Sequence, residues 1–181
     1  MRRVVGVFFA LVMVAPFGVI AAAPASAATV TGTVCKSFSG TASFAPTLPK
    51  LGSSSKVKAV LTGIGSIGSC SGAVSGGSVK FVSSKSAGEN CKTLGTPPSA
   101  AIKATEVITW NTGLTSTIAM RLSEVPATPV TTQAITGTVT AGVFQGAHEK
   151  GKLTYTALNG GCVSSGLSKI SFQSLGSITL K

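Results

Sequence analysis

Short runs of alternating apolar and polar residues, separated by Gly, Ser and Pro, dominate the sequence beyond residue 27. The stretch AIKATEVITW, residues 101–110, is typical of them. Alternation with a period of two predicts strands that bury one face, whereas residues that favour helices are sparse in this part of the chain. The sequence therefore predicts an all-β fold, an antiparallel sandwich or barrel of about 9–11 short strands.

The strand-like runs can be placed along the chain. We expect strands at 28–35, 37–45, 56–63, 77–83, 101–110, 114–122, 133–141, 143–148, 151–157, 167–173 and 175–180. Runs of one character lie on both sides of every loop, so residues 28–181 are expected to form a single β-sandwich domain. The glycine-rich stretch GIGSIGSCSGAVSGG, residues 63–77, has no phosphate-loop spacing, and we expect a flexible or tightly turning loop there.

Residues 1–27 have the order of a secretory signal peptide. Arg2 and Arg3 precede the apolar stretch 4–23, and Ala25-Ser26-Ala27 is a small-residue cleavage motif. A membrane anchor is the alternative, but prolines and a glycine interrupt the apolar stretch. We expect cleavage near Ala27, no transmembrane segment in the mature chain, and a product that is secreted or associated with the cell envelope.

Four cysteines follow the predicted cleavage site, namely Cys35, Cys70, Cys91 and Cys162. An even number of cysteines in an exported chain predicts two disulfides, and no C-x-x-C pair indicates a zinc site. Three connectivities are possible. A faint internal repeat, with TGTV at 31–34 and again at 136–139, puts the first two cysteines in one half. It favours the pairs Cys35–Cys70 and Cys91–Cys162.

The mature chain is strongly basic. Two of the 15 Lys and Arg residues lie in the predicted signal peptide, so 13 remain against four glutamates and the net charge is +9. Such a charge favours anionic partners, and we expect an anionic cell-wall polymer, a lipid surface or a protein, with solubility alone as the alternative. Nucleic acid is a weaker candidate, because Arg121 is the one remaining arginine and the lysines are scattered.

Patterns of catalytic and metal-binding residues are missing from the sequence. A Ser-His-Asp triad needs an acid to orient its histidine, but the chain has one His and no Asp. Glycosidase chemistry needs two carboxylates at a set separation in space, which four widely spaced glutamates permit without suggesting. We therefore expect no catalytic, cofactor-binding or metal-ligating residues, and a protein that is not an enzyme.

A hairpin around NTG, residues 111–113, makes Glu106 and Trp110 candidates for a functional role. A three-residue loop with Gly third pairs Glu106 with Ile118 and puts both with Trp110 on one largely apolar face. We expect Trp110 in the core or at its edge, with stacking on a sugar as the alternative. We expect Glu106 at an edge, where it reaches water or a lysine; a buried carboxyl would have a raised pKa and could serve as an acid.

The stretch GAHEKGK, residues 146–152, holds the one histidine of the chain. Its form matches NTG, and also TAG at 140–142, so it predicts a hairpin whose loop is Glu149-Lys150-Gly151. His148 and Lys152 would then pair on the solvent side. We expect His148 to be a small basic contact point rather than a catalytic base.

Several segments together resemble a family of small secreted actinobacterial proteins whose function is uncharacterised. They are ATVTGTVC after the signal peptide, LTGIGSIGSCSG, the NC of 90–91, the ITW of 108–110, VFQGA at 143–147 and the late NGGC. The resemblance covers most of the mature chain and rests on four cysteines in order around one Trp. It implies a secreted β-rich domain with two disulfides, and it supplies no catalytic residues.

The first functional hypothesis is a secreted non-enzymatic β-sandwich protein that binds an anionic cell-envelope component or a partner protein. The alternative is a secreted inhibitor of extracellular enzymes such as proteases, with GTPPSA at 95–100 or SEVPATPV at 123–130 as the exposed loop. A hydrolase that uses Glu106 or His148 and a pore-forming protein are less favoured alternatives.

Overall fold

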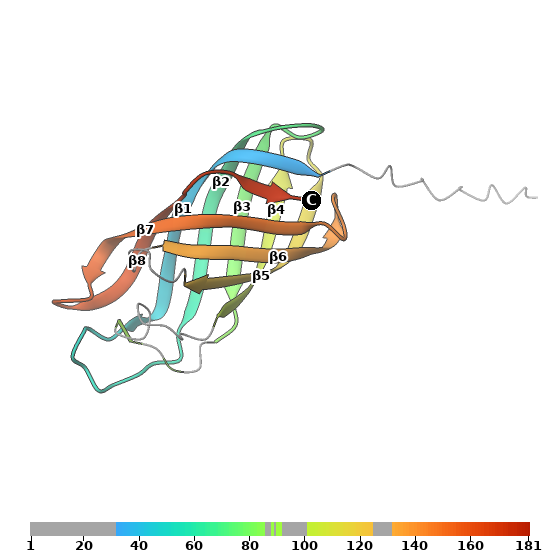
Figure 1. Cartoon of the computed structure of the whole chain (residues 1–181). Helices are drawn as coiled ribbons and strands as arrows, with labels where there is room; N and C mark the ends of the chain where they lie inside the picture. Colours follow the sequence, from blue (N-terminus) through green and yellow to red (C-terminus); the bar gives the residue numbers. More distant parts are fainter. Residues whose placement is uncertain (1–31, 86–87, 89, 92–100, 125–131) are drawn as a thin grey trace, which may run out of the picture.

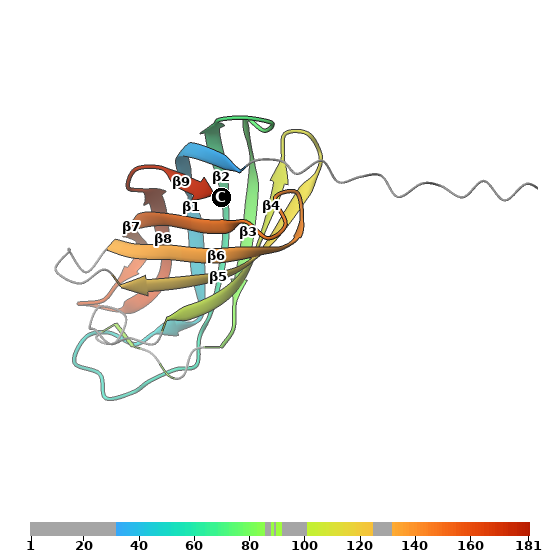
Figure 2. The ribbon, with the colours of Figure 1, turned by 45° about the vertical axis from the view of Figure 1, so that its right-hand side comes forward.

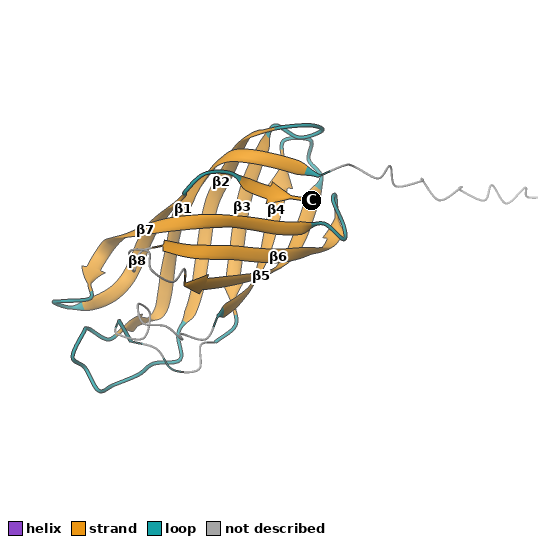
Figure 3. Cartoon of the chain, in the orientation of Figure 1, coloured by secondary structure: helices purple, strands orange, loops and turns teal. Residues whose placement is uncertain are grey.

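The computed structural model describes residues 32–85, 88, 90–91, 101–124 and 132–181, and these form an all-β antiparallel barrel (Figures 1 and 3). Its strands are β1 (Thr33–Leu48), β2 (Val60–Cys70), β3 (Gly76–Ser83), β4 (Ile102–Trp110), β5 (Thr115–Glu124), β6 (Thr132–Gly142), β7 (His148–Gly161), β8 (Gly166–Ser174) and β9 (Ile178–Leu180). No helix in this part of the chain has the length and apolar character to cross a membrane. The predicted signal peptide, residues 1–27, lies outside the described residues.

The sheet closes because its first strand pairs on both sides. Strands β1 to β8 each neighbour the next in sequence order, and β1 pairs with both β2 and β8, which completes a ring of eight strands. The short β9 lies in line with β8, between β7 and β1, where Thr33 pairs with Leu180. Figure 2 shows β5 to β7 crossing in front of β1 to β3. Of the two expected architectures, a sandwich or a barrel, the described residues form the barrel.

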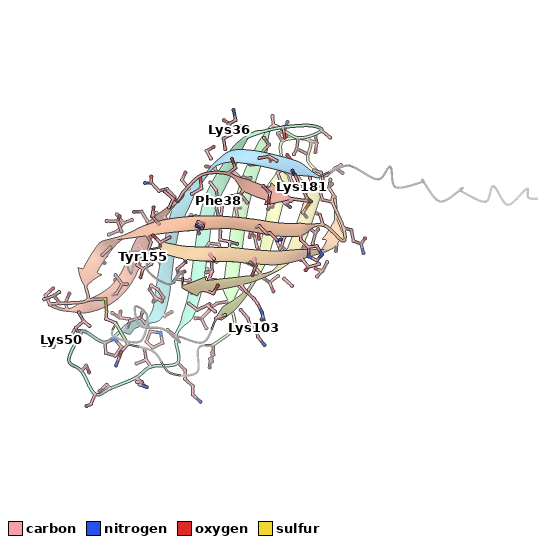
Figure 4. The ribbon with its side chains drawn as sticks, viewed as in Figure 1. Lys36, Phe38, Lys50, Lys103, Tyr155 and Lys181 are labelled. Carbon is pink, nitrogen blue, oxygen red and sulfur yellow. A yellow bond between two sulfur atoms is a disulfide. The ribbon has the colours of Figure 1, made fainter. Side chains whose placement is uncertain are left out.

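Alternation along the strands divides the barrel into a dry interior and an outer face. In β4 every second residue from Ala104 to Trp110 is buried, and the residues between them are exposed. The predicted pairing of Glu106 with Ile118 is confirmed. In Figure 4, Lys36 and Lys103 point away from the barrel, whereas Phe38, 2% exposed, lies within it.

Aromatic rings fill the interior beside β2, and glycines make room for them. Phe172 lies between Phe38 and Phe81, with ring centroids 5.2 and 5.7 Å apart. A Cβ at Gly63 would overlap the ring of Phe81, and a Cβ at Gly65 would lie 3.2 Å from Phe172. The glycine-rich stretch, for which the sequence predicts a loop, is mostly strand. Its glycines leave the space that the aromatic rings occupy.

Two disulfides hold the barrel, with the connectivity that the sequence favoured. Cys35–Cys70 joins β1 to β2 at a position where the two residues pair directly. Cys91–Cys162 ties the segment after β3 to the end of the β7–β8 hairpin, over a sequence separation of 71. Disulfides of this kind indicate an oxidising environment.

The predicted hairpins after residue 133 are wrong in one respect. The NTG turn is confirmed, with Gly113 at φ 81° and its N–H donating to the Trp110 carbonyl oxygen. The next turn, however, lies at 143–147, because TAG at 140–142 is the end of β6, and β7 runs without a break through Glu149-Lys150-Gly151. Phe144 explains the difference, because its ring is 5% exposed and packs edge-on against Trp110, which draws the turn onto the barrel end.

Replacing Gly63 tests whether the glycines are needed for the aromatic packing. Gly63→Val would push a branched side chain into the ring of Phe81, and we expect it to lower the free energy of unfolding by about 2 to 3 kcal/mol in urea titrations. Thr62→Val, on the exposed face of the same strand, is the matched control and should change it by less than about 0.5 kcal/mol. Equal effects of the two substitutions would contradict this packing argument.

Candidate functional site

Two carboxyl groups point into the interior of the barrel from the wall formed by β4 to β7. Glu106 on β4 is 0% exposed and Glu149 on β7 is 1% exposed. The prediction that Glu106 sits at an edge near water or a lysine is therefore wrong. The prediction that Glu149 lies in a hairpin loop is also wrong, because it occupies an inward position of β7, between the exposed His148 and Lys150.

Small residues give the Glu149 side chain its space. Glu149 pairs directly with Gly137 on β6, and Gly137 pairs in turn with Met120 on β5. A Cβ at Gly137 would lie 2.6 Å from Cγ2 of Ile118 and 3.0 Å from Oε2 of Glu149. The carboxyl group therefore reaches over a residue without a side chain, towards the interior that Glu106 also faces.

Among the described residues, no group other than the partner carboxyl group hydrogen-bonds the oxygens of Glu106 or Glu149. Burial in these apolar surroundings, and then the charge of Glu149, raises the pKa of Glu106 well above its usual value. Burial also raises the pKa of Glu149 to about 7, although hydrogen bonding to Glu106 acts in the opposite direction. At neutral pH the pair therefore retains at least one proton, which can bridge the two groups.

The outer face of the same wall is cationic. Lys103, Arg121, Thr136 and Lys150 stand on β4, β5, β6 and β7 at directly paired positions, so they form a row across the strands, which we call the cationic row. All four are exposed. They line a shallow groove of about 540 Å³, whose lining also includes Thr138 and His148. Adjacent strands are about 4.8 Å apart, so Lys103 and Arg121 are direct neighbours, and Lys150 lies two strands from Arg121, across Thr136.

His148 lies at the side of this groove and not at a hairpin tip. It is exposed, as predicted, and its Nδ1 is 3.3 Å from the hydroxyl oxygen of Thr138 on the neighbouring strand. Its backbone pairs with Lys181, and Thr138 pairs with it across the strands. Glu106 and Glu149 face the interior, away from this exposed ring, so neither of them orients it for catalysis.

Trp110 belongs to the core. Its side chain is 2% exposed, its Nε1–H donates to the Ser116 hydroxyl oxygen at 2.8 Å, and that hydroxyl donates to the Val143 carbonyl oxygen at 2.6 Å. Phe144 covers the ring at a centroid distance of 5.5 Å. The first expectation for Trp110, a core position, is therefore confirmed, and its indole has no exposed face on which a sugar could stack.

Within the described residues, no cluster of three or more His, Cys, Asp or Glu side chains could hold a metal ion. A catalytic acid must touch its substrate, and the barrel encloses Glu106 completely, so the geometry gives no support to a hydrolase that uses it. No protein-family model, curated protein or solved structure matches the chain in sequence or fold. The site itself therefore carries the argument about function.

Sequence reasoning could have placed Glu149 inside the barrel. In HEKGKL, residues 148–153, the charged residues His148, Lys150 and Lys152 alternate with Glu149, Gly151 and Leu153. Read as one strand, this pattern puts Glu149 on the face of Leu153, which is buried. The turn-like Glu-Lys-Gly concealed this signal.

The stability of the barrel should depend on pH through the acid pair. A folded-state pKa raised above the usual value means that the folded chain keeps a proton that the unfolded chain loses, so stability falls as pH rises from about 4.5 through about 7. Glu149 alone should lower the free energy of unfolding by about 2 to 3 kcal/mol between pH 5 and pH 8, and Glu106, whose pKa is raised well above its usual value, should add to this fall in urea titrations.

Removing the pair should abolish that dependence. In the double variant Glu106→Gln/Glu149→Gln both buried side chains are uncharged at every pH, so its free energy of unfolding should be nearly constant between pH 5 and pH 8. Glu124→Gln, which removes a carboxyl group outside the pair, is the control and should keep the full dependence. A protein that is equally stable at both pH values would show that neither carboxyl group is protonated in the fold.

Ser116 tests the core assignment of Trp110. Ser116→Ala leaves the buried indole N–H without its acceptor, and we expect a loss of about 1 to 3 kcal/mol in the free energy of unfolding. Thr115→Ala, at the neighbouring exposed position, should cost little. An indole that becomes accessible to quenchers without any loss of stability would argue against this role.

Proposed function

We propose that this protein is a secreted, non-enzymatic barrel that binds an anionic component of the cell envelope through the outer face of β4 to β7. The observation that carries the proposal is the cationic row, with Lys103, Arg121 and Lys150 exposed along one groove. Three cations on rigid strands offer an anion a pre-arranged site, which reduces the ordering that binding requires.

The distribution of charge supports this proposal. Both glutamates whose side chains are described lie inside the barrel, where they present no carboxylate to solvent. Lys152 and Lys181 extend the exposed positive charge beyond the groove on β7 and next to β9. A ligand that carries repeated phosphate, sulfate or carboxylate groups would meet positive charge over the whole of this wall.

The inhibitor alternative rests on other parts of the chain. The loop GTPPSA lies outside the described residues, and so does most of SEVPATPV. No feature of the described residues favours an inhibitor over a protein that binds an anion through the cationic row. Disulfide bonding agrees with an extracellular location, which both hypotheses require.

Charge-matched variants test the proposal. Lys103→Gln/Arg121→Gln/Lys150→Gln removes the cationic row, and Lys36→Gln/Lys80→Gln/Lys169→Gln removes three exposed lysines from β1, β3 and β8. Binding to dextran sulfate and to phosphatidylglycerol vesicles is measured at low salt. We expect the first variant to lose affinity about tenfold and the second to lose much less, because only the first removes charge from the groove. The two variants have the same net charge, so net charge would not explain such a difference.

High salt should dissociate the wild-type complexes, since exposed charges are screened within about 8 Å at physiological ionic strength. Equal losses in the two variants would mean that net charge alone attracts the ligand. No binding to either probe at low salt would sink the proposal.

A further inference from the structure

The buried acid pair lies directly behind the anion groove. Glu149 is itself one of the residues that line the groove, beside His148 and Lys150, and its side chain is 1% exposed and directed into the barrel. Gly137, over which that carboxyl group reaches, lies between Thr136 and Thr138, which also line the groove. A single sheet therefore separates the carboxyl group from the cations.

From this arrangement we propose that the buried pair Glu106–Glu149 makes anion binding in the groove proton-linked, so that the groove binds its anion more tightly when the pair is protonated. The inference rests on the proposed function, because it concerns the regulation of that same site. It gives the two buried carboxyl groups a role in binding at the cationic row.

The electrostatic reason is simple. A protonated pair adds no charge behind the groove, whereas each ionisation adds one negative charge on the far side of the sheet. That charge lies in a low-dielectric interior, where the salt of the solvent does not screen it effectively. It lowers the positive potential that Lys103, Arg121 and Lys150 present to an anion, and so weakens binding.

Coupling between two sites is reciprocal. If protonation of the pair strengthens anion binding, then a bound anion must in turn favour protonation of the pair by the same factor. The pKa of Glu149, which burial raises to about 7, places this exchange near neutral pH. An anion bound near pH 7 should therefore draw protons into the barrel.

Other charged groups near the pair must be separated from it. Among the described residues, no other ionisable side chain is buried with the pair. The exposed ones on the surrounding strands and beside them are Lys80, Lys103, Arg121, His148, Lys150, Lys152 and Lys181. A positive charge on the imidazole of His148 would strengthen anion binding in the same direction as a proton on the pair. His148 must therefore be removed from the test.

The experiment uses the mature chain and dextran sulfate, whose charge is constant over this pH range. In His148→Gln we expect the affinity to fall about fivefold or more from pH 5 to pH 8. In His148→Gln/Glu106→Gln/Glu149→Gln it should be constant within about twofold, at a level near that of His148→Gln at pH 5. Adding Glu124→Gln to His148→Gln is the control and should preserve the pH dependence.

Proton uptake gives a second readout that a merely structural role would not produce. Titration calorimetry at pH 7 in buffers of different ionisation enthalpy should show proton uptake on binding in His148→Gln, and none when both glutamates are also replaced. Near-ultraviolet circular dichroism checks that each variant is folded. The single variants Glu106→Gln and Glu149→Gln, each in the His148→Gln background, should show intermediate uptake if the double replacement does not fold.

The outcomes separate the two proposals. Binding that is independent of pH in His148→Gln, or equally dependent on pH without the glutamates, would overturn the proton linkage and leave the groove intact as a binding site. An absence of binding at every pH would overturn the proposed function and the linkage with it.

Discussion

Pairing of β1 with both β2 and β8 is the constraint on which the rest of the structure depends. The Cys35–Cys70 disulfide fixes the first of these pairings at a directly paired position. Once the ring of eight strands is closed, each of its strands has a partner on both sides, and successive residues of a strand point alternately to the interior and to the solvent. The period of two in the sequence thereby becomes a separation of chemistry between two sides of one wall.

That separation explains why the most polar residues of the interior deserve a functional interpretation. Burying a carboxyl group without a partner is costly, so an interior chosen for stability alone would have an apolar residue at these positions. Glu106 and Glu149 instead lie together inside the barrel, behind the cationic row. A shared proton reduces the cost of burial and makes the pair sensitive to its surroundings.

The sequence predicted the fold class and the register of the NTG hairpin, because both depend on local signals, and the faint internal repeat favoured the observed disulfide pairing. Alternation around Glu106 and Ile118 defines one face, and Gly113 defines the turn between their strands. The choice between sandwich and barrel depends on whether β1 meets β8, which lies more than 100 residues away and leaves no local trace. The strand character of Gly63 and Gly65 likewise depends on rings from β3 and β8.

The candidate site was less predictable for the same reason. Glu106 was identified as a misfit on an apolar face, but its burial depends on β7 crossing nearby with Glu149. The cationic row is formed by four strands, and the spacing of Lys103, Arg121 and Lys150 in sequence says nothing about their alignment. Only the register between strands brings them together.

Both β8 and β9 lie between β7 and β1, and this arrangement limits the order in which the barrel can form. As the chain emerges from its N-terminus, β1 can pair with β2 early, but its other side stays bare until residues 166–180 arrive. An unpaired strand edge of this length is a template for pairing with another chain. The unfinished barrel is therefore the form of this protein most prone to aggregation and strand exchange, and its closure joins the chain's earliest strand to its latest ones.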